Sequence, residues 1–198
     1  WPDGPTAEMI TGKTGPGSLY ALYKPTTPEW NGKLVIYAHG YVKPALDVDL
    51  PHGSDNPATN PEGYLFSQLQ KHFLSEGYGL AYSSYSENGW AVKDGITRTR
   101  QLLGLYTSRF GKPVYTYLIG ASMGGAVAAA LAVSALGVGT ASAASKAKLN
   151  VVHGIPGGDV NVCVNGAEAI PDFSPGEVVT GVALAAGLYD LKIVAQAD

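Results

Sequence analysis

The sequence is poor in cysteine, in charge and in long unbroken apolar runs, and each shortage excludes a class of protein. The only cysteine is Cys163, so no disulfide can form within the chain. Charged side chains make up 15% of the 198 residues and leave a net charge of −3, which favours neither a nucleic acid nor an anionic membrane as a partner. Glycine and serine interrupt the apolar stretch 126–144, which argues against a transmembrane helix. Zinc-ligand spacing, phosphate-binding glycine loops and nucleotide motifs are all missing, so we expect no metal and no cofactor.

The most informative stretch is residues 113–132, which read PVYTYLIGASMGGAVAAALA. A β-branched and aromatic run leads into Gly120-Ala121-Ser122-Met123-Gly124, and a row of helix formers follows. This order of strand, sharp turn and helix is the setting of a nucleophile elbow, where only small residues fit two positions before and after a strained serine. The pattern therefore predicts Ser122 as a nucleophile. The alternative is a glycine-rich turn that only packs a helix on a sheet.

A second turn can supply the groups that stabilise an oxyanion. A buried strand predicted over residues 33–38 ends in His39-Gly40-Tyr41. We predict the backbone N–H of Tyr41 as one oxyanion donor and that of Met123, at the start of the elbow helix, as the other. His39 and Trp90 are predicted to line the substrate site, although Trp90 could equally cap the core.

The other patterns predict an α/β fold in which strands and helices alternate around a parallel sheet. The polar stretch from Tyr41 to Pro61 predicts a substrate-facing loop, and the alternative is a flexible insertion. Residues 1–17 are rich in proline and glycine and predict an irregular leading segment. The remaining expected elements are an outer antiparallel strand at 18–24, a helix at 62–76, a strand at 78–84 and a helix at 93–110.

In order and spacing, the His39-Gly40 turn and the elbow resemble the α/β-hydrolase superfamily of serine esterases and lipases, over about residues 15–135. The resemblance implies a carboxylic-ester hydrolase that forms an acyl-enzyme on Ser122, with an acidic residue and then a histidine following the serine. It also implies a partner that is a small or polymeric ester. A site rich in tyrosine and tryptophan suits an aromatic or synthetic ester, polyesters included. Few residues follow Ser122, so the hydrolase sheet is predicted to be truncated.

The end of the chain reads differently, as short alternating strands with an Asn165-Gly166 turn. We predict these strands at 149–152, 159–164, 178–183 and 188–194. Residues 148–197 resemble the first half of a β-sandwich domain of unknown function found on bacterial secreted and cell-wall proteins. Residues 140–144 resemble the cleavage end of a secretory leader. We therefore predict a hydrolase-like region at 1–140, a strand-rich tail at 141–198 and a secreted bacterial protein.

A serine nucleophile needs a general base, which is usually a histidine. His153 is the histidine in the chain order that the hydrolase resemblance implies, so we predict it as the base, oriented by Asp172 or Asp159. The alternatives are a carboxylate from a partner chain and a purely structural His153. His52 is predicted to be solvated and His72 to be structural.

Two functions stay open on the sequence. The first is the ester hydrolase, and the second is a non-catalytic secreted surface or binding protein that keeps a remnant of a hydrolase fold. A truncated sheet leaves an unpaired edge beside the elbow strand, and this predicts either a homodimer through that edge or its occupation by the C-terminal strands.

Overall fold

The computed structural model describes residues 5–135, 147–153, 158–184 and 190–195. The chain forms two compact units, Trp1–Ala128 and Ala129–Asp198. The boundary predicted at 140/141 lies outside the described residues and stays a prediction.

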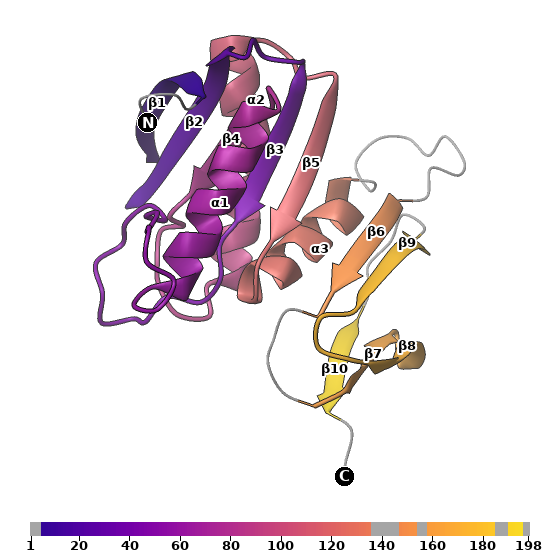
Figure 1. Ribbon diagram of the computed structural model, residues 1–198. Helices are drawn as coiled ribbons and strands as arrows, with labels where there is room; N and C mark the ends of the chain where they lie inside the picture. The colour runs from indigo at the N-terminus through magenta and orange to yellow at the C-terminus, as the bar shows by residue number, and fades with distance from the viewer. Residues whose placement is uncertain (1–4, 136–146, 154–157, 185–189, 196–198) are drawn as a thin grey trace. The chain divides into compact units, whose positions relative to one another are not determined.

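The first unit is built on a five-stranded mixed sheet in the order β1-β2-β4-β3-β5 (Figure 1). The central strand β3 pairs in parallel with β4 and with β5, as predicted for the alternating strands and helices. On the other side β2 is antiparallel to β4 and to β1. The strands are β1 (Thr6–Thr14), β2 (Ser18–Thr27), β3 (Lys33–Ala38), β4 (Gly79–Ser83) and β5 (Tyr115–Gly120).

The prediction of an irregular leading segment was wrong for most of its length. Residues Thr6–Thr14 form β1, which pairs with β2 from Thr14 opposite Ser18 back to Thr6 opposite Thr27. Two of the glycines that suggested irregular structure lie in the hairpin turn, where Gly15 and Gly17 have φ values of 62° and 85°. Glycine adopts this left-handed backbone without steric cost, so the same residues that hid the strand close the hairpin.

Two helices cover opposite faces of this sheet. Helix α1 (Pro61–Ser75) starts at Asn60, whose side chain accepts a hydrogen bond from the N–H of Gly63. Helix α2 (Val92–Phe110) follows β4, and α3 (Met123–Ala135) follows β5. Alternate residues of β3 point to the two faces and divide the core into two clusters. The α1 face buries Val35, Tyr37, Phe66, Leu74, Leu80 and Tyr82, and the α2 face buries Tyr20, Leu22, Leu34, Ile36, Leu102 and Tyr106.

Strand β5 is the last strand of the sheet, so the elbow strand has an unpaired edge within the described residues, as the sequence predicted. Val114, Tyr115 and Tyr117 are exposed along it. The homodimer through this edge stays a prediction.

The second unit contains two small antiparallel sheets, β10-β7-β8 and β6-β9. The predicted Asn165-Gly166 turn is present, with φ values of 53° and 79° that suit a tight hairpin. Strand β8, which follows this turn, was not predicted, because Pro171 and two acidic residues interrupt its alternation. The strands are β6 (Ala147–Val152), β7 (Val160–Val164), β8 (Ala167–Phe173), β9 (Val178–Leu184) and β10 (Leu191–Ala195).

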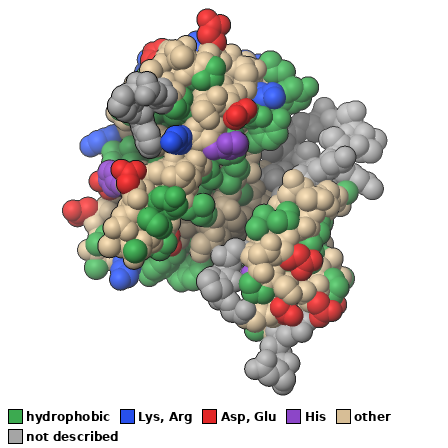
Figure 2. All heavy atoms as spheres, viewed as in Figure 1, with side chains coloured by type: hydrophobic (Ala, Val, Ile, Leu, Met, Phe, Trp, Pro, Cys, Tyr) green, Lys and Arg blue, Asp and Glu red, His purple; other side chains and the backbone are tan. Residues whose placement is uncertain are grey.

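The surface agrees with the nearly balanced composition. On the face drawn in Figure 2, acidic and basic side chains are scattered over the first unit without a large patch of one sign. Among the helices of the described residues, none combines the length and apolar composition needed to cross a membrane.

Candidate functional site

The elbow has the strained geometry that its sequence predicts. Ser122 lies between the end of β5 and the first residue of α3, is exposed, and has a φ of 53°. A Cβ at Gly120 would lie 2.6 Å from the backbone nitrogen of Gly125, and one at Gly124 would lie 2.6 Å from the carbonyl oxygen of His39. Real Cβ atoms do not approach other atoms this closely, so both positions require glycine. The local backbone is as predicted, while the role of Ser122 as a nucleophile stays a prediction.

The turn after β3 lies directly against the serine. A Cβ placed on Gly40 would lie 3.2 Å from Cβ and 3.7 Å from Oγ of Ser122. The N–H of Ala121 also donates to the carbonyl of Ala38 at 3.2 Å, which ties the two turns together. Both follow neighbouring parallel strands whose carboxyl ends share one edge of the sheet (Figure 1). Within the described residues, the backbone N–H groups of Tyr41 and Met123 make no hydrogen bond, and their role as oxyanion donors stays a prediction.

His39 is buried rather than open to a substrate. Its Nδ1 lies 2.8 Å from the carbonyl oxygen of Gly40, and its ring stacks on Tyr85 with the centroids 3.9 Å apart. Burial lowers the pKa of His39, so the ring is neutral at pH 7. Because a carbonyl can only accept, the contact with Gly40 places a proton on Nδ1 of His39. The buried ring leaves little surface for the substrate contact predicted for His39.

Tyr41 and Trp90 form an exposed aromatic pair beside this turn. Their ring centroids are 5.6 Å apart, and Trp90 is 78% exposed. The N–H of Gly89 donates to the carbonyl of Val42 at 2.8 Å, which joins the two loops that carry the rings. Trp90 therefore does not cap the core, which was the alternative to its predicted substrate-binding role.

Tyr85 is the residue at this site that sequence reasoning missed. It follows β4, is 1% exposed and has a φ of 59°. Its hydroxyl donates to the carbonyl oxygen of His39 at 3.0 Å, and burial raises its pKa, so the hydroxyl keeps its proton. A tyrosine in a polar loop carries no sequence signal for such a contact, because the contact depends on how two loops meet.

The other histidines are distributed over both units. In the first unit His52 is exposed and its Nε2 lies 2.9 Å from Oδ2 of Asp49. His72 is also exposed on α1, with its ring against Phe73, although it was predicted to be structural.

In the second unit His153 is buried with its ring centroid 5.4 Å from that of Phe173. Neither ring nitrogen has a hydrogen-bond partner in the described residues, so Asp172 and Asp159 do not orient it there. Asp172 is exposed, and its backbone N–H donates to Oδ1 of Asn161. The role of His153 as the base and that of Asp172 or Asp159 as its orienting carboxylate stay predictions.

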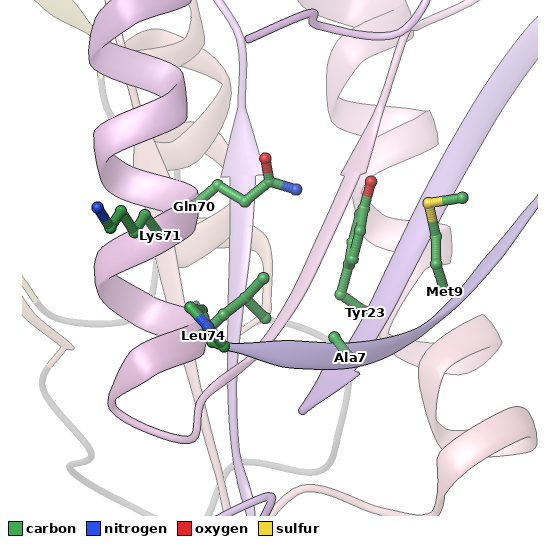
Figure 3. Close-up of a pocket in the computed structure, with 7 residues that line it drawn as sticks. Ala7, Met9, Tyr23, Gln70, Lys71 and Leu74 are labelled. Carbon is green, nitrogen blue, oxygen red and sulfur yellow. The ribbon is translucent and has the colours of Figure 1, made fainter. Parts of the chain in front are cut away.

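A separate pocket lies between the N-terminal hairpin and α1 (Figure 3). None of its lining residues belongs to the elbow or to the turn after β3, so it is not part of the site around Ser122. The lining residues are Pro5, Ala7, Met9, Tyr23, Gln70, Lys71 and Leu74. Among the described residues, no three histidine, cysteine or acidic side chains gather as the ligands of a metal ion would.

Comparisons with known proteins leave the family open. No protein family matches the chain, and no curated protein is similar in sequence. A solved structure that resembles it is a crystal structure of a variant of the esterase rPPE, with a TM-score of 0.41 and 15% sequence identity. The similarity covers 67% of this chain but 39% of that esterase, so the chain spans well under half the length of that protein.

Proposed function

We propose that the protein is a carboxylic-ester hydrolase of α/β-hydrolase type that forms an acyl-enzyme on Ser122. The observation that carries the proposal is the left-handed backbone of Ser122 between two glycines that tolerate no side chain. A non-glycine residue in this conformation costs about 1–3 kcal/mol, and such strain clusters at functional sites. A turn that only packed a helix on a sheet would gain nothing from placing an exposed serine there.

In the proposed reaction, Oγ of Ser122 attacks the ester carbonyl carbon while its proton passes to a base. The oxygen that becomes negative accepts hydrogen bonds from the N–H groups of Met123 and Tyr41. Loss of one such donor typically costs about 2.7–4 kcal/mol of transition-state stabilisation. The tetrahedral intermediate then collapses, the alcohol leaves with the proton, and water hydrolyses the acyl-enzyme in a second round.

We propose His153 as the base on the grounds of its chain order, with His52 as the competing assignment. His52 already has a carboxylate partner in Asp49, and the loop that carries it begins at the turn against Ser122. A carboxylate bound to one ring nitrogen holds the other in the unprotonated state that a base requires. Replacing His153 and His52 one at a time, and measuring ester hydrolysis by each variant, separates the two assignments of the base.

The substrate class that we propose is an ester with an aromatic group, which includes synthetic polyesters. An exposed pair of aromatic rings is an unusual surface feature, and Tyr41 is next in sequence to the glycine that faces Ser122. Offset or tilted contacts with such rings contribute about 0.5–1.5 kcal/mol beyond area burial. Replacing Trp90 with Ala should therefore raise the KM of a benzoate ester by up to about tenfold. Leu103→Ala, at an exposed position of α2, is the control.

The test is hydrolysis of p-nitrophenyl acetate by the full chain and by Ser122→Ala, with mass spectrometry after labelling by a fluorophosphonate. The proposal expects covalent label on Ser122 and a loss of at least about 10³-fold in kcat in the variant. Ser108→Ala, an exposed serine on α2, is the matched control. Equal activity in wild type and Ser122→Ala, without labelling, would reject the hydrolase and favour a surface or binding protein.

A further inference from the structure

Two consecutive carbonyl groups of the turn beside Ser122 are held by buried side chains. The carbonyl of His39 accepts from the hydroxyl of Tyr85 at 3.0 Å, and the carbonyl of Gly40 accepts from Nδ1 of His39 at 2.8 Å. These two contacts come from different segments of the chain, since one is made by the loop after β4 and the other by the turn itself.

Holding these carbonyls also fixes the direction of two N–H groups. The peptide bond is planar and trans, so each N–H points opposite to the carbonyl with which it shares a plane. The carbonyl of His39 therefore sets the N–H of Gly40, and the carbonyl of Gly40 sets the N–H of Tyr41. Both N–H groups belong to the turn that lies against Ser122.

The side chains that hold the turn are themselves held firmly. The rings of Tyr85 and His39 stack at 3.9 Å with their planes 22° apart, and both residues are buried. Gly95 of α2 makes room for the tyrosine, because a Cβ there would lie 3.0 Å from its ring. The next residue, Ser86, donates its backbone N–H and its hydroxyl to Asp94 at 2.6 Å each. Tyr85 is kept in a strained left-handed backbone by these contacts.

We propose that Tyr85 is a positioning residue of the oxyanion hole, which acts through its stack and hydrogen bond on His39 to orient the N–H group of Tyr41 toward Ser122. This inference rests on the proposed hydrolase function. The inference adds a residue from a third loop to the candidate site. It also explains why the hydroxyl of a buried tyrosine donates to a carbonyl of this turn. Pre-oriented donors need no reorganisation when the negative charge develops, and this is the source of their catalytic effect.

The test compares Tyr85→Phe with Tyr106→Phe in the full chain. Tyr106 is also fully buried, and its hydroxyl also donates to a backbone carbonyl, that of Tyr23 at 3.3 Å. Both variants keep the ring and lose one hydroxyl-to-carbonyl hydrogen bond, so a purely structural role predicts the same result for both. We expect about a tenfold lower kcat with an unchanged KM for p-nitrophenyl acetate in Tyr85→Phe, and no change of kcat in Tyr106→Phe. Equal kcat values in the two variants would overturn the proposal.

A second measurement does not depend on activity. Residual dipolar couplings report the orientation of individual N–H bonds, and those of Gly40 and Tyr41 should change in Tyr85→Phe but not in Tyr106→Phe. Unchanged couplings in Tyr85→Phe would overturn the proposed positioning even in an inactive protein. A wild type no more active than Ser122→Ala would instead reject the hydrolase function. Failure of the proposed positioning and failure of the proposed function can therefore be told apart. Rescue offers a third check, because His39→Asn can still donate to Gly40 and should retain more kcat than His39→Leu.

Discussion

The two units differ in how their strands are covered, although both contain β-sheets. In the first unit β3 and β4 are buried on both faces, because helices follow them and pack on either side. In the second unit the strands of the described residues are mostly exposed or half-buried, and beyond α3 the buried side chains are Ile170, Phe173 and His153. A sheet that is packed on both faces can stabilise strained turns at the ends of its strands. The first unit is therefore better suited to hold the candidate site.

The largest expected difference in stability between the two units comes from replacing a glycine in each of them. A Cβ at Gly124 would meet the carbonyl oxygens of Ala38 and His39, whereas nothing lies within 4 Å of one at Gly158 in the second unit. We expect Gly124→Ala to destabilise the first unit by about 3 kcal/mol or more, since two backbones must move apart. Gly158→Ala should change stability by less than about 1 kcal/mol. Urea denaturation of both variants measures this difference, and a harmless Gly124→Ala would contradict the elbow geometry.

The next effect concerns the cores themselves. Leu34 is fully buried in β3, and Leu34→Ala should cost about 3–4 kcal/mol because rigid neighbours leave a cavity. Ile170→Ala should cost about 2 kcal/mol or less, since its sparser surroundings can collapse into the space. Hydrogen exchange, followed on peptides from each unit, measures the loss of stability in the two units separately. Equal losses would show that the second unit is as well packed as the first.

The sequence predicted the first unit better than the second, and the reason is physical. Buried central strands and amphipathic helices leave strong patterns, so β3 was predicted with its observed ends and the helices within a residue or so. The elbow was also predictable, because its steric demand selects glycine at 120 and 124. Strand β8 was missed because half-exposed strands tolerate acidic residues and proline.

Contacts between loops left no pattern in the amino-acid sequence. The hydroxyl of Tyr85 reaches a carbonyl 46 positions earlier in the chain, and the pair of Asp49 and His52 depends on the path of a loop. Neither follows from a period or a motif. The candidate nucleophile was therefore readable from the sequence, whereas the residues that support it were not.

A smaller effect concerns the edges of the two units. The edge strand β5 reads YTYLIG without charge or proline, whereas β8 at an edge of the second unit carries Glu168, Pro171 and Asp172. Charges and proline prevent edge strands from pairing with other chains. We expect the protein to self-associate through β5, and Tyr115→Lys to shift sedimentation toward the monomer. Glu168→Gln should leave the association unchanged, and a wild type that stays monomeric at high concentration would contradict the edge dimer.

The smallest effect is a dependence of stability on pH that arises at His39 in the first unit. Burial holds the pKa of His39 below its ordinary value near 6.5, so the unfolded chain binds a proton more readily than the folded one. Stability from this residue is complete above about pH 6.5 and declines as the pH falls below it, because protonation favours the unfolded chain. Thermal melts between pH 8 and pH 5 should show this decline in wild type and a smaller one in His39→Asn, whose side chain does not titrate. Parallel slopes in the two proteins would mean that folding does not lower the pKa of His39.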